Sequence, residues 1–80
     1  MPKSRTASAE EQLQALLRQV RTEAGLTQTD VAQSLGQPQS FVSKYESGER
    51  RLDVLELREV CRAVGISLAE FVRRLEEALR

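Results

Sequence analysis

Amide, hydroxyl and cationic side chains follow one another along a short polar segment that runs from Gln39 to Arg51. A glutamine amide presents a donor and an acceptor together, which matches N6 and N7 of adenine in the DNA major groove. Ser40 can donate or accept, and Lys44 can reach guanine or a phosphate. Arg50 and Arg51 suit phosphate contacts, which set register without reading sequence. The segment therefore has the chemistry of a nucleic-acid contact.

Groups that carry out catalysis are scarce in the sequence. It contains no histidine and a single cysteine, and it has no glycine-rich loop that would cradle a phosphate. We therefore expect no enzyme activity, no catalytic residue, no metal site and no cofactor. Cys61 has no partner thiol, which fits a reducing, cytoplasmic location, and we interpret it as a small core residue.

The length and charge of the chain set its class. Eighty residues make one domain, here residues 1–80, with a thin core. Twelve basic and twelve acidic residues give zero net charge, which is mild evidence against a nucleic-acid binder. The distribution matters more, because the cations gather around the polar segment. Two glutamates lie among three cations there, so the local excess is only +1: Lys44, Arg50 and Arg51 against Glu46 and Glu49.

The first seven residues, "MPKSRTA", are polar and contain a proline. We expect residues 1–7 to form a loose basic arm, in which Lys3 and Arg5 are solvated. No apolar run follows them, so we expect no signal peptide. No stretch approaches the roughly 20 apolar residues of a membrane span, so we expect no membrane association.

Start and stop signals divide the chain into helices. A spacing typical of helix N-termini, with a capping side chain followed three residues later by an acid, occurs four times. These pairs are Ser8 and Glu11, Thr27 and Asp30, Asp53 and Glu56, and Ser67 and Glu70. Four glycines that suit helix C-termini follow the apolar periods: Gly25, Gly36, Gly48 and Gly65. The predicted helices cover about 9–24, 28–35, 38–47, 54–64 and 68–79.

The apolar residues of each predicted segment recur at helical spacing, and no run alternates with period two. We therefore predict an all-α, compact five-helix bundle without strands. The third helix lacks a hydroxyl cap, and we place Pro38 at its first helical position.

Helices 28–35 and 38–47 are joined by a very short turn at Gly36 and Gln37. So short a link forces the second helix to cross the first steeply, in a helix-turn-helix. Ala32 permits the close approach because its side chain is small, and Val42 and Tyr45 fill the core from the third helix. The N-terminal end of helix 38–47 then projects outward.

The wider pattern, with "LTQ", "SFVSKYESG" and "AVGISLAEF" as its most specific parts, resembles the lambda-repressor-like family of DNA-binding domains, also called Cro/C1 or Xre type. The resemblance covers roughly residues 10–72. It implies a five-helix bundle whose third helix, here 38–47, enters the major groove of double-stranded DNA. Pro38, Glu49 and Leu52 depart from the family pattern, and Glu49 weakens the expected backbone grip.

Matching positions imply roles for individual residues. The expected base contacts are Gln39, Ser40, Ser43 and Lys44. The expected backbone contacts are Gln28, Ser47, Arg50 and Arg51. Gln28 is also expected to support the recognition helix, and Glu46 to bond near the end of that helix. Phe41 either packs in the protein, which we favour, or meets a thymine methyl. For the two arginines the alternative is solvent exposure or pairing with Glu49 or Asp53.

One helix-turn-helix reads only a few base pairs, so we expect a homodimer on a palindromic operator, with recognition helices about 34 Å apart. Helix 68–79 carries a narrow apolar seam in a 4-3-4 spacing, typical of a helix–helix contact. The predicted interface residues are Leu52, Leu55, Leu68, Val72, Leu75 and Leu79. Phe71 is better placed for the monomer core. The alternative is that all these side chains close the monomer core.

These features together predict a sequence-specific DNA-binding transcriptional regulator, which we expect to be a repressor. The alternative is an antitoxin-like or other protein-interaction module whose main partner is a protein. We expect no second, ligand-sensing domain, and therefore no small-molecule ligand.

Overall fold

The computed structural model describes residues 2–80, with side chains from residue 9 onward. Over this range the chain forms helices without strands, as predicted. The helices are α1 (Pro2–Glu23), α2 (Gln28–Leu35), α3 (Gln39–Ser47), α4 (Val54–Val64) and α5 (Leu68–Ala78). Within the described residues, none of them combines the length and apolar character needed to cross a membrane.

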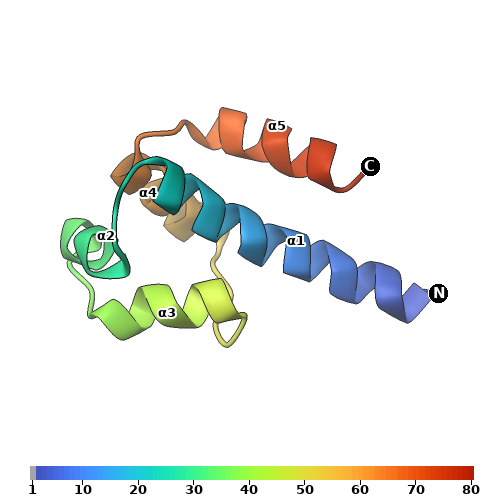
Figure 1. The fold of residues 1–80 in the computed structure, drawn as a ribbon, viewed down its shortest axis with the longest axis horizontal. Coiled ribbons are helices and arrows are strands. Elements are labelled where there is room, and N and C mark those ends of the chain that lie inside the picture. The colour runs from blue at the N-terminus through green and yellow to red at the C-terminus, as the bar shows by residue number, and fades with distance from the viewer. Residues whose placement is uncertain (1) are drawn as a thin grey trace.

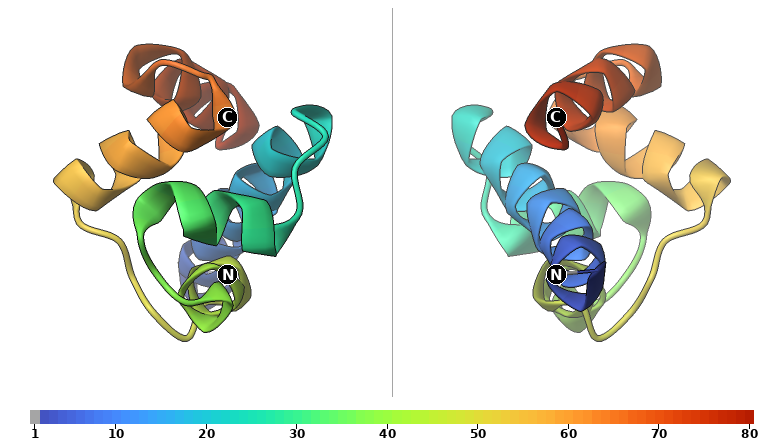
Figure 2. Two further views of the ribbon diagram at one scale, coloured as in Figure 1. Left: turned by 90° about the vertical axis from the view of Figure 1, so that its left-hand side faces the viewer. Right: turned by 90° about the vertical axis from the view of Figure 1, so that its right-hand side faces the viewer.

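The long helix α1 organises the bundle. In Figure 1 it crosses the molecule between α5 above and α3 below, and both chain ends lie at the same side. In the end-on views of Figure 2, α2 lies between α3 below and α4 above, at the opposite end of the molecule. Helix α3 lies at the rim of the bundle, so one of its long faces is free.

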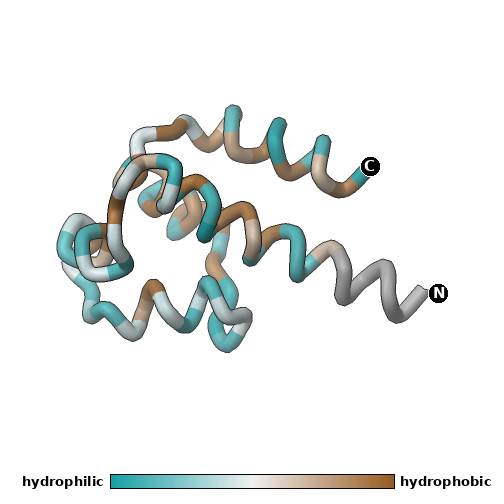
Figure 3. Tube along the Cα trace, viewed as in Figure 1, coloured by the Kyte–Doolittle hydropathy of each residue, from teal (hydrophilic) through white to brown (hydrophobic). Residues whose placement is uncertain are grey.

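The core is apolar and lies where the helices converge, as the brown segments of Figure 3 indicate. Its fully buried members come from α2 to α5, and Val31, Val42 and Phe71 are 0% exposed. The prediction that Phe71 belongs to the monomer core is confirmed. Cys61 is also a core residue, as predicted, and burial raises the pKa of its thiol, which keeps it protonated.

The predicted caps start three of the helices. At α2 and α4 the capping box is complete. The side chains of Thr27 and Asp53 each accept from the backbone N–H three residues later. The acidic side chain at that later position accepts in turn from the backbone N–H of the capping residue. At α5 the Ser67 hydroxyl accepts from the backbone N–H of Glu70. Helix α5 ends at Ala78, one residue before the predicted end.

The expected loose arm is wrong for the described backbone, because α1 already begins at Pro2. Ser8 therefore lies inside the helix and does not start it. Proline is tolerated in a first helical turn, and residues 3–24 contain no glycine or proline to interrupt the helix. Met1, and the side chains of residues 2–8, including Lys3 and Arg5, lie outside the described part of the chain.

Pro38 is the N-cap of α3 and not its first helical residue, which corrects the predicted start by one position. Its φ of −69° suits a helix, but its ψ of 157° is extended. Pro38 has no side-chain group to cap with, so its carbonyl accepts the first bond, from the Phe41 N–H at 2.9 Å.

Candidate nucleic-acid interface

The turn between α2 and α3 has the predicted construction. Gly36 is left-handed, with φ of 67°, and the N–H of Gln37 donates to the Ala32 carbonyl at 2.9 Å. Ala32 is only 2% exposed, so its small side chain lies in the packed interior. Val42 and Tyr45 are buried on the inner face of α3. These contacts fix α3 against α2 and leave the outer face of α3 uncovered.

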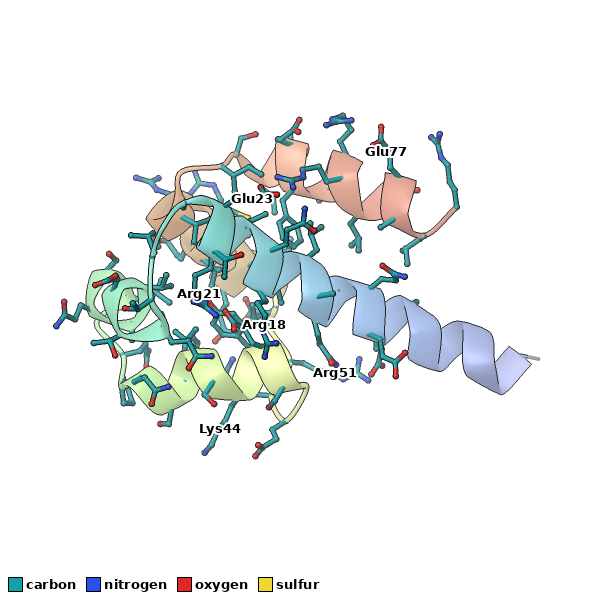
Figure 4. All side chains as sticks on the ribbon, in the orientation of Figure 1. Arg18, Arg21, Glu23, Lys44, Arg51 and Glu77 are labelled. Atoms are coloured by element: carbon teal, nitrogen blue, oxygen red, sulfur yellow. The ribbon has the colours of Figure 1, made fainter. Side chains whose placement is uncertain are left out.

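The outer face of α3 carries most of the predicted base contacts. Gln39, Ser40 and Lys44 are exposed, and Ser43 is half-buried. Figure 4 shows the Lys44 side chain directed away from α1, on the far side of α3. Among residues 9–80, Lys44 takes part in no ion pair. Ser47 is exposed at the end of α3, and its hydroxyl donates to the Lys44 carbonyl at 3.1 Å.

Two glutamines connect the starts of α2 and α3. The Nε2 of Gln39 donates to the Oε1 of Gln28 at 2.5 Å. The Nε2 of Gln28 in turn donates to the Oε1 of Glu46 at 3.1 Å. The predicted support of the recognition helix by Gln28 therefore has a geometric basis, since its amide lies between Gln39 and a buried carboxylate.

Glu46 is the buried charged residue of the described chain, at 5% exposure, and Arg21 from α1 neutralises it. The Nε and Nη2 of Arg21 donate to the two carboxylate oxygens at 2.7 and 3.0 Å. Arg21 also donates to the Leu26 carbonyl, and Arg18 lies 3.7 Å from the carboxylate. Both arginines reach from α1 toward α3 in Figure 4. The hydrogen bond that Arg21 donates to Glu46 raises the pKa of Arg21, although burial opposes this.

Arg50 is engaged within the protein. Its guanidinium bonds both carboxylate oxygens of Glu56, at 3.1 and 2.7 Å, and lies 4.6 Å from the centre of the Phe41 ring. The bond from Arg50 is the main reason that the pKa of Glu56 is lowered. Phe41 also meets Tyr45 edge to face, with ring centres 5.7 Å apart. Phe41 is therefore partly buried and packs against the protein core, while a contact with a thymine methyl stays a prediction.

Arg51 reaches back to the N-terminal half of α1. Its Nη2 lies 2.6 Å from a carboxylate oxygen of Glu10, although its side chain is 85% exposed. The alternative that the two arginines pair with Glu49 or Asp53 is wrong, because their carboxylate partners are Glu56 and Glu10. Those acids lie 6 and 41 residues from their arginines, so closeness along the chain did not predict the ion-pair partners.

The six predicted interface residues divide into two groups. Leu52, Leu68 and Leu75 are half-buried and pack against the core. Leu55, Val72 and Leu79 are exposed, at 72%, 42% and 44%. Val54 is also 64% exposed. The structure thus leaves apolar side chains uncovered on both α4 and α5.

Comparisons with known proteins agree with this geometry. The Helix-turn-helix family model matches residues 17–71. The uncharacterized HTH-type transcriptional regulator y4dJ of Sinorhizobium fredii (strain NBRC 101917 / NGR234) is 38% identical over 58 residues, which are 72% of this chain and 75% of that protein.

Solved structures share the whole fold. An XRE-family like protein from Pseudomonas syringae pv. tomato str. DC3000 has a TM-score of 0.85 and 42% identity, over 95% of this chain and 93% of its own. The restriction-modification controller protein C.Esp1396I, solved as a tetramer with its natural 35 base-pair operator, has a TM-score of 0.80 at 21% identity, over 89% and 93%. The first match and the family model together place this chain in the helix-turn-helix family of the lambda-repressor-like, XRE type.

Proposed function

We propose that residues 1–80 form one DNA-binding unit of a transcriptional regulator that reads double-stranded DNA with α3. The observation that carries this proposal is the exposed N-terminal end of α3, where Gln39 is held in place by Gln28. An α-helix fits the major groove, which is about 12 Å wide, and an oriented glutamine amide matches an adenine edge.

The exposed side chains suggest a division of roles. Gln39, Ser40 and Lys44 would meet base edges, with Ser43 at the margin of the contact because it is half-buried. Lys44 could meet DNA without first breaking an ion pair, since it forms none among the described side chains.

The backbone contacts are proposed for Gln28, Ser47, Arg50 and Arg51. The two arginines lie on the loop after α3, where a phosphate would pass. Each must exchange a carboxylate for a phosphate to make this contact, because Glu56 and Glu10 hold them in the free protein. Charge-assisted bonds to phosphate suit arginine's planar donor fork.

We also propose that the protein acts as a homodimer on a palindromic operator, as a cytoplasmic repressor. The support is the set of uncovered apolar side chains on α4 and α5. Val72 and Leu79 lie seven residues apart, so they lie on one side of α5. Two copies would place their recognition helices one DNA turn apart, about 34 Å.

Selection of bound sequences from random duplex DNA tests the DNA-binding proposal directly. We expect enrichment of one short motif, repeated with opposite orientation at a spacing of about one helical turn. Gln39→Ala should fail to enrich the same base at one position of each repeat. If wild-type protein enriches no motif at low salt, the sequence-reading role is wrong and a protein-interaction module is favoured.

Sedimentation of the free protein tests the dimer. Val72→Glu with Leu79→Glu should yield a folded monomer that protects one half-site, because both side chains are exposed in the monomer. Glu76→Gln is a matched control on the same helix and should leave the oligomeric state unchanged. A wild-type chain that sediments as a monomer at tens of micromolar and protects a single half-site would contradict the proposed dimer.

A further inference from the structure

The buried carboxylate of Glu46 dictates how its neighbours orient. An ionised carboxylate only accepts hydrogen bonds. The adjoining amide of Gln28 must therefore present its Nε2, and the structure shows this contact at 3.1 Å. The opposite orientation would place a carbonyl oxygen against the carboxylate. In the observed orientation the Oε1 of Gln28 faces Gln39, whose Nε2 donates to it.

Arg21 holds the carboxylate of Glu46 in place. Its guanidinium remains protonated at any ordinary pH, and it bonds both oxygens of Glu46. A third bond, to the Leu26 carbonyl at 3.0 Å, ties the same guanidinium to the segment before α2. The Arg21 side chain is 13% exposed and that of Glu46 is 1% exposed, so water competes little with these bonds.

We propose that Glu46, held by Arg21, is a positioning residue that sets the direction of the two amides and thereby the base preference of Gln39. The inference rests on the proposed DNA-reading function and deepens it. Neither Glu46 nor Arg21 needs to touch DNA for this role.

The proposed direction has a definite consequence at the DNA surface. One N–H of Gln39 is used by Gln28, which leaves its second N–H and its Oε1 available. These two groups form the donor and acceptor pair that matches N7 and N6 of adenine. If the amides were free to turn over, donor and acceptor would exchange places and the match to adenine would be lost. Glu46 thus favours one base without contacting it.

Replacement of the ion pair by apolar residues separates positioning from stability. Arg21→Leu with Glu46→Leu removes both charges together, and such replacements often leave a protein folded. Discrimination between adenine and other bases at the Gln39 position should fall about tenfold, within the range of one bidentate contact. Affinity for random DNA should change less than about twofold, because its phosphate contacts are retained.

Two further variants control the experiment. Arg74→Leu with Glu23→Leu removes an ion pair between α1 and α5 that lies outside the glutamine network, and it should leave discrimination unchanged. Glu46→Gln provides a second test if the double leucine variant does not fold, since a neutral amide can either donate to or accept from Gln28. It should lower discrimination in the same direction.

A double-mutant cycle with Gln39→Ala identifies the pathway of the effect. Once Gln39 is absent, loss of the Arg21–Glu46 pair should cause no further loss of discrimination at that base pair. Equal weakening on operator and random DNA would show that the pair is structural only and would overturn the proposal. Unchanged discrimination in a folded variant would also overturn it.

Side-chain amide NMR of the free protein tests the orientation without DNA. The hydrogen-bonded Nε2 proton of Gln28 and that of Gln39 should each exchange at least about tenfold more slowly in the wild type than in the double leucine variant. Exchange rates that do not change would overturn the positioning role. A wild-type chain with slow amides and no sequence preference would instead overturn the proposed function.

Discussion

The two regions proposed to meet DNA are built in opposite ways. At the start of α3, Gln39 is held through Gln28 by a carboxylate that is itself buried and neutralised. On the loop after α3, Arg51 is held by a single exposed carboxylate on a distant helix. The first arrangement is anchored on a buried ion pair, whereas the second is an exposed contact that water and salt can break.

This difference corresponds to the two tasks of a DNA contact. Base recognition depends on the direction of donors and acceptors, so it benefits from side chains that are fixed in advance. Phosphate binding depends on charge, and a mobile cation can find a phosphate after the helix has docked. Under the proposed function, Glu10 and Glu56 would compete with phosphate for the loop arginines, because they pair with them in the free protein.

The largest expected effect is on stability, in the buried region. Glu46→Ala should lower the free energy of unfolding by about 3–5 kcal/mol, because it leaves the Arg21 guanidinium without its partner in a mostly buried site. Urea unfolding measures this value. Arg51→Ala is the matched variant for the loop pair, and it should lower the same quantity by less than about 1 kcal/mol. Similar losses for both variants would remove the contrast between the regions.

Gln39→Ala should have the next largest effect. It should lower discrimination at one base pair by about 1–3 kcal/mol, since one bidentate contact is lost. Binding to random DNA should barely change, because Gln39 is uncharged. Competition binding with operators altered at single positions measures both quantities. Uniform weakening on every sequence would contradict a base-reading role for Gln39.

Removal of Arg51 and removal of Glu10 should change the affinity for DNA in opposite directions. Arg51→Ala should weaken binding on all sequences and make the slope of log K against log salt shallower by about one unit. Glu10→Gln should instead strengthen binding, by up to about fivefold, because it frees Arg51 for phosphate.

Glu70→Gln is the matched control for Glu10→Gln, because Glu70 pairs with Arg73 on α5, outside the proposed DNA interface. This control should leave the salt slope unchanged. If Glu10→Gln weakens binding, the carboxylate is not a competitor of phosphate.

The smallest expected effect is a loss of stability in acid, through the pair of Arg50 with Glu56. The pKa of Glu56 is lowered in the folded protein, chiefly by its bond to Arg50. The unfolded chain therefore binds this proton more readily, and stability is lost as pH falls below about 4.3. Arg50→Ala should make the acid dependence of urea unfolding shallower. An unchanged dependence would mean that Arg50 does not hold Glu56 in solution.

Local signals in the sequence predicted most of the fold. Thr27 and Asp53 cap their helices through groups only three residues away, and Gly36 ends α2 through its own backbone freedom. Such features depend on spacing that is visible in the chain. The predicted start of α3 was one residue early for a local reason as well, because Pro38 fits both the cap and the first helical position.

The polar network was not predictable in the same way. Glu46 was expected to bond near the end of α3, but its partner Arg21 lies 25 residues away on another helix. Nothing in the spacing around Arg21 distinguishes it from the other arginines of α1. The partner of Arg51 was missed for the same reason, since the packing of α1 beside the loop brings Glu10 to Arg51. Tertiary packing decides which charges meet.

The position of Arg21 also limits how far this recognition element can be moved. Residues 27–48 contain both glutamines, Glu46 and the turn, and they look like a portable unit. Transplanted into another scaffold, however, this segment would leave a carboxylate unpaired beneath its reading face, because its counter-ion belongs to α1. A faithful graft must therefore carry residues 18–26, the end of α1 and the segment after it, along with the helix-turn-helix.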